Sequence, residues 1–428
     1  MEETEADYEY VDELPEQQVS ELLAEVWQQT ILHWNYRRLR VLPDRVLDEC
    51  SHIQQIYLKR NLLTNLPSSF GNLSQLTYCY LHGNNIECLP DSLGKLMSLQ
   101  VLDIGNNKIK HLPKSLGRLP SLRSLVAVYN QITSFPKELC NLKALSVLML
   151  SGNNLKYLPE AIGGLTGLQG LYVDHNQLRE LPRSIASLPL LTRISCCCNA
   201  LTHLPALNFK SKPTVFFDDN PQMNYLPFTL LKQLRNGESW DPVVLQTCGC
   251  FQEVAGASNS LLISLKRSTV NDNPRCLVLP PQIYWISSSV LHIEQPPLLE
   301  LCLRSIWKEM REQTDVDIGI RKSTSATFSN LSQNSLPSTL CDILLTGPVT
   351  YCNYSHCKSP VFSYCSLSVI KVMVTSRIGT RGTVVPSILY FCSDLCRGMY
   401  VRDINVMKDD FSIWLHRCLK ESYNIKVV

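Results

Sequence analysis

The sequence lacks several features that would place it in a familiar functional class. Its net charge is only +2, so no strong electrostatic field favours nucleic acid or an acidic membrane surface. No apolar run approaches the roughly 20 residues that a membrane-spanning helix needs. The opening segment MEETEADYEYVDELPE is acidic and has no apolar core, which argues against a secretory signal peptide. We therefore expect a cytoplasmic protein, with the nucleus as a second location, that binds neither nucleic acid nor membrane.

Signatures of catalysis are missing as well. The chain contains no phosphate-binding Walker loop, no nucleophile elbow, no dinucleotide fingerprint and no HExxH motif. We therefore expect that the protein is not an enzyme. In a reducing compartment its 18 cysteines should be thiols or metal ligands and not disulfides.

One repeated pattern occupies the chain from about residue 53 to 227. Asparagine recurs every 23 residues, and the period slips only when Asn220 follows its predecessor after 21 residues. The phased residues are Asn61, Asn84, Asn107, Asn130, Asn153, Asn176 and Asn199. In each copy, leucines occupy alternate positions of a short strand before the asparagine. Leu-Pro then begins a returning segment in which apolar residues recur at every third position. A period of 20 to 29 residues with this sequence pattern indicates a leucine-rich repeat.

The repeat pattern, together with two cysteine pairs near the C-terminal end, predicts an α/β fold with two parts. The first is a leucine-rich repeat solenoid, a horseshoe with a parallel sheet on its concave face. The second is a smaller, zinc-stapled α+β region at the C-terminal end. The expected divisions are an acidic disordered tail (1–16), a capping helix (17–31), the solenoid (32–236), a connecting module (237–310), a polar linker (311–335) and a Cys-rich module (336–428). Within the solenoid, Arg37 stands where asparagine belongs in the first repeat, and LPFTLLKQLRNG predicts a second capping helix that ends at Gly237.

Four segments carry a resemblance to a known group. NYRRLRVLP, IYLKRNLLTNLP, YLHGNNIECLP and LYVDHNQLRELP resemble repeats of intracellular leucine-rich repeat proteins of animals that have cysteine pairs near the C-terminus. The resemblance covers most of the chain, but it is looser between about residues 240 and 290. It implies a solenoid and says little about activity.

The outward-facing strand positions of the solenoid are rich in tyrosine, valine and methionine. Tyrosine and methionine are typical of the cores of protein interfaces, and contiguous apolar surface needs an explanation. We therefore expect a protein partner on the concave face, or else strands that are simply rich in β-forming residues. The candidate contact residues are Tyr57, Tyr78, Tyr80, His82, Val126, Val128, Tyr129, Met149, Tyr172 and His175.

The stretch QPPLLELCLRSIWKEMREQ predicts a helix with Leu298, Cys302 and Ile306 on one face. This sequence motif resembles the Elongin C-binding box of cullin ubiquitin-ligase receptors, in which a helix binds in a groove of the partner. After a Ser/Thr-rich linker come four residues that resemble the cullin-selecting half of such a box, namely Leu336, Pro337, Leu340 and Leu344. The resemblance implies Elongin B/C and a cullin as partners. The alternative is two short helices that pack a local core.

Two cysteine pairs lie close to the C-terminal end. Cys352 and Cys357 form C-x4-C, Cys392 and Cys396 form C-x3-C, and two predicted strands separate the pairs. Such pairs suit a tetrahedral zinc site, and a site closed by four protein ligands is structural and not catalytic. The second pair resembles an FCS-type finger, whereas the first departs from the usual C-x2-C spacing and leaves His356 as an alternative to Cys357. Four unmetallated thiols are the other alternative.

Two functional hypotheses follow from these features. In one, the repeats hold a substrate protein and the C-terminal box recruits a cullin ubiquitin ligase. In the other, the chain is a signalling scaffold whose C-terminal part is only a zinc-stapled cap. Removal of the metal is expected to loosen the C-terminal region and to leave the repeats intact.

Overall fold

The computed structural model describes two compact units. The first comprises the repeats up to residue 177 together with residues 188–195, and the second comprises residues 178–187 and the chain from residue 196 onward. The described residues are 16–206, 209–211, 213–223, 225–227, 229, 262–266, 275–278, 283, 285–287, 298–316, 343–344, 348–362, 364–374, 383–406 and 424–427.

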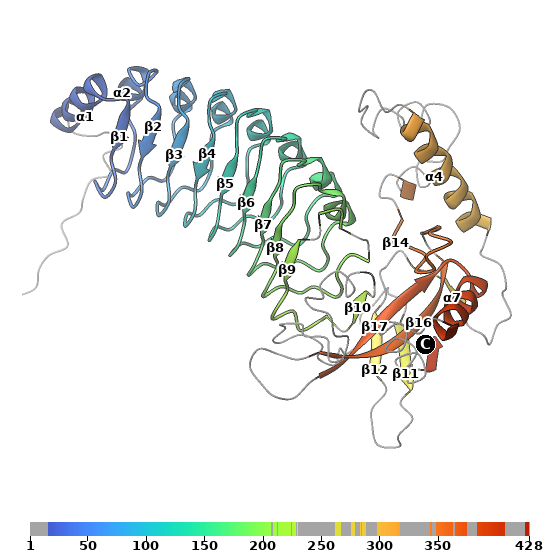
Figure 1. Cartoon of the computed structure of the whole chain (residues 1–428). Coiled ribbons are helices and arrows are strands. Elements are labelled where there is room, and N and C mark those ends of the chain that lie inside the picture. Colours follow the sequence, from blue (N-terminus) through green and yellow to red (C-terminus); the bar gives the residue numbers. More distant parts are fainter. Residues whose placement is uncertain are drawn as a thin grey trace, which may run out of the picture. The chain divides into compact units, whose positions relative to one another are not determined.

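The repeats form the predicted parallel sheet. Its strands are hydrogen-bonded to one another in chain order (Figure 1). They are β1 (Ile31–His33), β2 (Gln55–Tyr57), β3 (Tyr78–Tyr80), β4 (Val101–Asp103), β5 (Ser124–Val126), β6 (Val147–Met149), β7 (Gly170–Tyr172), β8 (Arg193–Ser195) and β9 (Thr214–Phe216). The middle residue of each strand from β1 to β8 is fully buried, while its two neighbours in most of these strands keep some exposure, as period-2 alternation requires.

The return legs form a second layer behind the sheet (Figure 1). Most of these short helices follow a proline, which fixes its own backbone angle and cannot extend a strand. They are α2 (Asp44–Asp48), η1 (Ser68–Asn72), η2 (Asp91–Lys95), η3 (Lys114–Arg118), η4 (Lys137–Asn141), η5 (Glu160–Gly164) and η6 (Arg183–Ser187). Neighbouring legs approach closely. A Cβ atom at Gly94 would lie 2.6 Å from the carbonyl oxygen of Ser115, so this spacing requires glycine.

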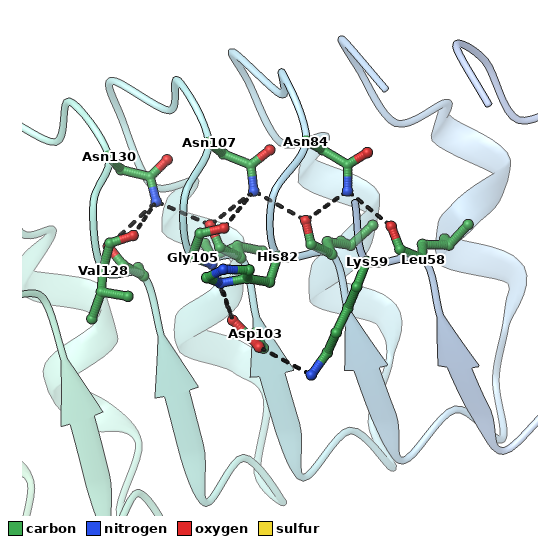
Figure 2. Close-up of polar contacts among 12 residues, drawn as sticks. Leu58, Lys59, His82, Asn84, Asp103, Gly105, Asn107, Val128 and Asn130 are labelled. Atoms are coloured by element: carbon green, nitrogen blue, oxygen red, sulfur yellow. Dashed lines mark hydrogen bonds and ion pairs between the residues drawn. The ribbon is translucent and has the colours of Figure 1, made fainter. Parts of the chain in front are cut away.

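A ladder of asparagines joins each repeat to its neighbours (Figure 2). The amide of Asn107 donates to the carbonyl oxygens of Leu81 and Ile104 at 3.1 and 3.0 Å, and its Oδ1 accepts a hydrogen bond from the backbone N–H of Ile86 at 3.0 Å. The phased asparagines from Asn61 to Asn220 are all buried. Each side chain therefore pairs buried backbone groups at a turn where the strand can no longer do so.

The residue before each phased position is in the left-handed region of backbone space. Its φ lies between 51° and 74° in every repeat, although only two of these residues are glycine. The row consists of Tyr36, Arg60, Gly83, Asn106, Tyr129, Gly152, His175, Cys198 and Asp219. A non-glycine residue in this region costs roughly 1–3 kcal/mol and persists where the surrounding structure fixes it. Here the fixing contact is a backbone hydrogen bond to the next repeat, as from the Tyr129 N–H to the Ser151 carbonyl oxygen at 2.8 Å.

The helix α1 (Glu16–Gln28) covers the first repeat. It ends three residues before the expected boundary because Ile31 belongs to β1. Its buried residues are Val19, Leu22, Leu23 and Val26. Glu25 attaches the helix to the repeats, since its carboxylate accepts a hydrogen bond from Trp34 at 2.7 Å and pairs with Arg37 at 2.9 Å. Arg37 occupies the position where the first repeat lacks asparagine, and its backbone N–H donates to the amide oxygen of Asn61.

The second unit contains the C-terminal module. Its elements are β10 (Leu226–Pro227), β11 (Leu262–Lys266), β12 (Arg275–Val278), β13 (Trp285–Ser287), α4 (Leu298–Val316), β14 (Thr350–Tyr351), β15 (Pro360–Val361), β16 (Tyr364–Val374), β17 (Thr383–Phe391), α7 (Asp394–Val406) and β18 (Asn424–Val427). One sheet has the order β10-β17-β16-β13, a second the order β12-β11-β18, and β14 pairs with β15. The long β16–β17 hairpin is antiparallel, and β10 is parallel to β17.

One expected element differs in this unit. Leu226 and Pro227, which the sequence assigned to a capping helix, form the strand β10. Most of the remaining residues of that expected helix, up to Gly237, lie outside the described residues. Among the described residues, no helix combines the length and apolar character that crossing a membrane requires.

Candidate functional site

The four predicted metal ligands come together in the second unit. Cys352 follows β14 and Cys357 lies in the turn before β15, while Cys392 follows β17 and Cys396 lies in the first turn of α7. Their sulfur atoms all lie within 4.8 Å of one another. Within the set, the Sγ of Cys392 is 3.5 Å from that of Cys357 and 3.4 Å from that of Cys396. Two distant chain segments thus place four thiols in one cluster, as their spacing predicted.

The geometry of this cluster fits a zinc ion. Zn–S bonds of about 2.3 Å in a tetrahedron require sulfur atoms about 3.8 Å apart, close to the spacings found here. Four sulfur donors in this arrangement are the set that zinc or an iron–sulfur centre prefers. Among the described residues, this is also the one group of cysteine, histidine and acidic side chains close enough to hold a metal. Bound zinc would supply structural cross-linking and no open coordination position for chemistry.

The thiols of the cluster are protonated when no metal is bound. Hydrogen bonding to Cys352, and then burial, raise the pKa of Cys392 above its usual value, and burial raises the pKa of Cys396 to about 11. These thiols therefore hold their protons at neutral pH unless a positive charge stabilises the thiolates. A divalent metal provides that charge and releases protons as it binds.

His356 does not belong to the cluster. Its side chain is 69% exposed, and its Nδ1 faces the carboxylate of Asp403 at 4.0 Å. Its neighbour Cys357 provides the fourth sulfur, even though C-x4-C is longer than the usual knuckle. The extra length forms a tight turn that ends at Lys358, a residue with a positive φ of 53°.

The strand β17, which ends just before Cys392, also contacts the last repeat. The hydroxyl of Ser387 donates to the carbonyl oxygen of Leu226 at 2.9 Å, and the hydroxyl of Tyr390 donates to that of Tyr225 at 3.3 Å. Tyr225 in turn stacks on His203, whose side chain is 11% exposed and whose pKa is lowered to about 4 by burial first and by Arg183 second. This side of the last repeat is therefore covered by neutral, hydrogen-bonded groups.

Two of the clustered cysteines follow these contacts at a fixed interval. Thr350 donates from its hydroxyl to the carbonyl oxygen of Ala206 at 2.6 Å, and Cys352 comes two residues later. On the other strand, Tyr390 contacts the repeat and Cys392 again comes two residues later. Asn353 joins the two strands, because it exchanges hydrogen bonds of 2.8 and 2.6 Å with the backbone of Tyr390. The cysteine cluster and the residues that contact the last repeat are therefore joined by hydrogen bonds and by short chain segments.

The helix α4 is attached to this module by its polar side. Glu300 is fully buried and accepts hydrogen bonds from the N–H groups of Phe362 and Tyr364 at 3.0 and 3.2 Å. Arg304 pairs with Glu300 at 2.8 Å and donates to the carbonyl oxygen of Cys392 at 3.2 Å. The opposite side of the helix is apolar and faces outward. Leu298 is 77% exposed, Leu301 is 42% exposed and Cys302 is also exposed.

Of the remaining residues of the expected ligase box, two pack inside the module and three lie outside the described residues. Ile306 is half-buried and packs against a small core formed by Leu303, Leu344 and Phe362. Leu344, expected to face a cullin, is fully buried in that core, so at this residue the alternative of local packing describes the structure. Leu336, Pro337 and Leu340 lie outside the described residues.

The ten expected contact residues of the concave face all keep solvent exposure. Tyr129 and His175 are exposed on the left-handed row, and the other eight are half-buried on strands or just after them. Register places Tyr57, Tyr80, Val126, Met149 and Tyr172 in one row across the sheet, with Asp103 between the tyrosines and the apolar residues. His82 and His175 lie four repeats apart, so they do not form a joint site.

A polar cluster on this face was missed as a unit by the sequence reasoning (Figure 2). Asp103 faces Lys59 at 3.9 Å and His82 at 3.8 Å, and it accepts a hydrogen bond from the Gly105 N–H at 3.1 Å. Burial first, and neighbouring groups second, raise the pKa of Tyr80, so its hydroxyl stays protonated. The signal was available, because the 23-residue period places Lys59 and His82 at the same position of adjacent repeats.

Comparisons with known proteins agree on the repeat block. A model described as a leucine-rich repeat region matches residues 25–150 and 114–209. A search of curated proteins found no significant match. Among solved structures, internalin C2 from Listeria monocytogenes is 25% identical with a TM-score of 0.32, and the match covers 36% of this chain and 66% of that one.

Two further structures have similar scores. A leucine-rich repeat protein of Leptospira interrogans is 23% identical with a TM-score of 0.27, covering 50% of this chain and 77% of that one. The plant peptide hormone receptor RGFR1, in complex with RGF2, is 22% identical with a TM-score of 0.37, covering 49% and 38%. All three TM-scores are below 0.5, so the assignment rests on the family model and on the repeats themselves. Residues 25–209 of this chain are thus similar to leucine-rich repeat regions.

Proposed function

We propose that the protein binds a partner protein on the concave face of its repeats and performs no catalysis of its own, in the cytoplasm. The observation that carries this proposal is the central row of Tyr57, Tyr80, Val126, Met149 and Tyr172, which stays partly exposed on an ordered sheet. An ordered row of amphipathic and apolar side chains loses little conformational entropy on binding, which favours recognition. The sequence of the repeats also resembles that of leucine-rich repeat-containing protein 28 of animals. This resemblance does not identify a binding partner.

Substitutions on the concave face provide the test of this function. A Tyr80→Ala, Met149→Ala, Tyr172→Ala variant should lose its main co-purifying partner by at least tenfold, because each residue offers exposed apolar surface to the contact. The measurement is quantitative mass spectrometry after affinity purification from cells. Met97 and Tyr157 offer a matched control, since both are exposed outside the strands. Equal loss with Met97→Ala, Tyr157→Ala, or no loss with either variant, would contradict the proposal.

Two readings of the C-terminal module remain, each supported by a different observation. The first is substrate recognition for a ubiquitin ligase, with α4 docking in Elongin C and the following segment selecting a cullin. Its support is that Leu298 and Cys302 face outward while Glu300 and Arg304 fix the other side of the helix. The buried state of Leu344 weakens the cullin-selecting half of this reading.

The second reading is a scaffold whose module serves as a cap. Its support is the set of contacts that joins the module to the last repeat, above all the pairing of β10 with β17. A solenoid needs such a cover because an open sheet edge exposes unpaired backbone groups and apolar surface. The two readings are compatible in structure, so they must be separated by partner binding.

A pulldown of Elongin B/C separates them. If α4 docks in Elongin C, wild type should retain the complex and a Leu298→Ala, Cys302→Ala variant should lose it by about one to two decades in affinity, since a buried leucine side chain contributes roughly 1.5–3 kcal/mol. Leu190→Ala, an exposed leucine on the repeats, is the matched control. Failure of wild type to retain Elongin B/C would leave the scaffold reading, and equal retention by both variants would place the contact elsewhere.

A further inference from the structure

The first three repeats carry a group of hydrogen-bond donors on the concave face. We call His33, Tyr57, Lys59, Arg60 and Tyr80 the donor patch. The rings of His33 and Tyr57 stack with centroids 4.8 Å apart, those of Tyr57 and Tyr80 also at 4.8 Å, and the Lys59 amine lies 4.5 Å from the centre of the Tyr80 ring. Stacked rings cover one another's faces, and the Tyr57 hydroxyl already donates to Gln55 at 3.1 Å. The patch therefore presents ring edges, the Tyr80 hydroxyl and two cationic groups to a ligand.

The carboxylate next to the patch is already engaged. Asp103 faces Lys59 and His82 and accepts the Gly105 N–H, and its side chain is only 15% exposed (Figure 2). Lys59 is 38% exposed and Arg60 is exposed, so positive charge remains available on the surface of the patch. A ligand that fits these groups carries carboxylates or other anionic oxygens.

Charge is also distributed unevenly over the first repeats. The acids Asp44 and Asp48 belong to α2, in the layer behind the sheet, where Ser69 and Asn72 hydrogen-bond them (Figure 1). Arg38 and Arg40, which follow β1, are exposed and basic. Lys59 and Arg60 give the donor patch a positive charge, which favours an acidic partner.

The chain itself contains a segment of matching chemistry. Residues 1–15 contain seven acidic residues, two tyrosines and no lysine or arginine. They precede Glu16, the first residue of α1, and α1 is attached to the first repeat through Glu25. Fifteen extended residues reach about 50 Å, whereas α1 is only about 20 Å long, so the segment can return to the patch. Covalent attachment gives such a segment an effective concentration in the millimolar range, and a weak contact then suffices.

We propose that residues 1–15 bind the donor patch in cis, with their carboxylates on Lys59 and Arg60 and their tyrosines against the ring edges. The segment thereby occupies the first third of the concave face until a partner displaces it. The proposal concerns the face assigned to partner binding above, but its test needs no external partner. The failure of one proposal can therefore be distinguished from the failure of the other.

The test measures the binding of a fluorescein-labelled peptide of residues 1–15 by fluorescence anisotropy. A protein that lacks residues 1–15 should bind the peptide, and the full-length protein should bind it at least tenfold more weakly because the attached segment competes. Raising the salt concentration from 50 to 500 mM should weaken binding severalfold, since screening acts on exposed charges. A full-length protein in which the seven acidic residues of the segment 1–15 are changed to Asn and Gln should bind the peptide as tightly as the truncated protein does.

Charge substitutions locate the contact. In the truncated protein, Lys59→Glu, Arg60→Glu should abolish binding, whereas Lys108→Glu, Lys110→Glu, an equal change at exposed residues outside the patch, should preserve it. A peptide with lysine in place of its glutamates should bind the Lys59→Glu, Arg60→Glu protein, which excludes misfolding as the cause of the loss. No binding to the truncated protein, or equal loss with both variants, would overturn the proposal. A dimer that forms only when residues 1–15 are present would also overturn it, in favour of a second copy as occupant.

Discussion

Asn130→Ala should lower the free energy of unfolding by at least about 3 kcal/mol, since each buried polar group left without a partner costs roughly 1–3 kcal/mol. The side chain of Asn130 donates to the carbonyl oxygens of Ile104, Val128 and Ala127 at 3.0, 3.2 and 3.3 Å. Its Oδ1 also accepts the Ile109 N–H at 3.0 Å. Alanine removes all four hydrogen bonds at once, and the neighbouring repeats cannot replace them from rigid turns. Urea-induced unfolding monitored by circular dichroism measures the change.

The same replacement at an exposed asparagine gives the control. Asn154 is exposed and immediately follows another ladder residue, Asn153. Asn154→Ala should change the free energy of unfolding by less than about 0.5 kcal/mol, as is usual at the surface. If Asn130→Ala and Asn154→Ala unfold alike, the ladder contributes no stability beyond that of an exposed side chain.

Loss of zinc should have the largest effect on the second unit. Freshly purified, reduced protein should contain about one zinc per chain, which elemental analysis can measure. Structural zinc contributes about 10–16 kcal/mol in small zinc modules, so chelation should lower the opening free energy of β17 by several kcal/mol. Because Tyr390 and Thr350 hold the last repeat, the loss should extend to Ala206 and Tyr225, and not stop at the module.

Hydrogen exchange after chelation locates this effect. Amides of β14, β17 and the last repeat should exchange faster, while amides of β2 to β6 should keep their protection. Cys396→Ser should reproduce the result of chelation, and Cys88→Ser, at an exposed thiol of the repeats, should not. Protein without zinc in fresh preparations, or unchanged exchange in β17 after chelation, would end the zinc hypothesis.

Local repetition explains what could be predicted from the sequence. The 23-residue period defines which leucines are buried, where the strands lie and which asparagines bridge the turns, because each repeat contacts mainly its neighbours. The cysteine cluster was predictable for a related reason. Cysteine pairs at short spacing followed by a strand or helix leave few geometries open, and the structure places all four Sγ atoms together.

Long-range pairing explains what could not be predicted. Nothing in the sequence near Leu226 indicates that it pairs with Ser387, so a helix was the natural expectation for that segment. The periodicity around Leu298 identified an amphipathic helix, but it placed Ile306 on the exposed side together with Cys302. The structure shows that the buried pair Glu300 and Arg304 fixes the rotation of the helix, a preference that apolar spacing alone cannot reveal.

The cap has a consequence for synthesis on the ribosome. Ser387 lies 161 positions after its partner Leu226, and Tyr390 lies 165 positions after Tyr225. At a translation rate of about 5–20 residues per second, the last repeat waits roughly 8–30 seconds for the strand that covers it. The repeats can fold during this interval because their contacts are local, but β10 has no β17 to pair with until then. During synthesis the unpaired backbone of β10 is therefore open to other strands and to chaperones.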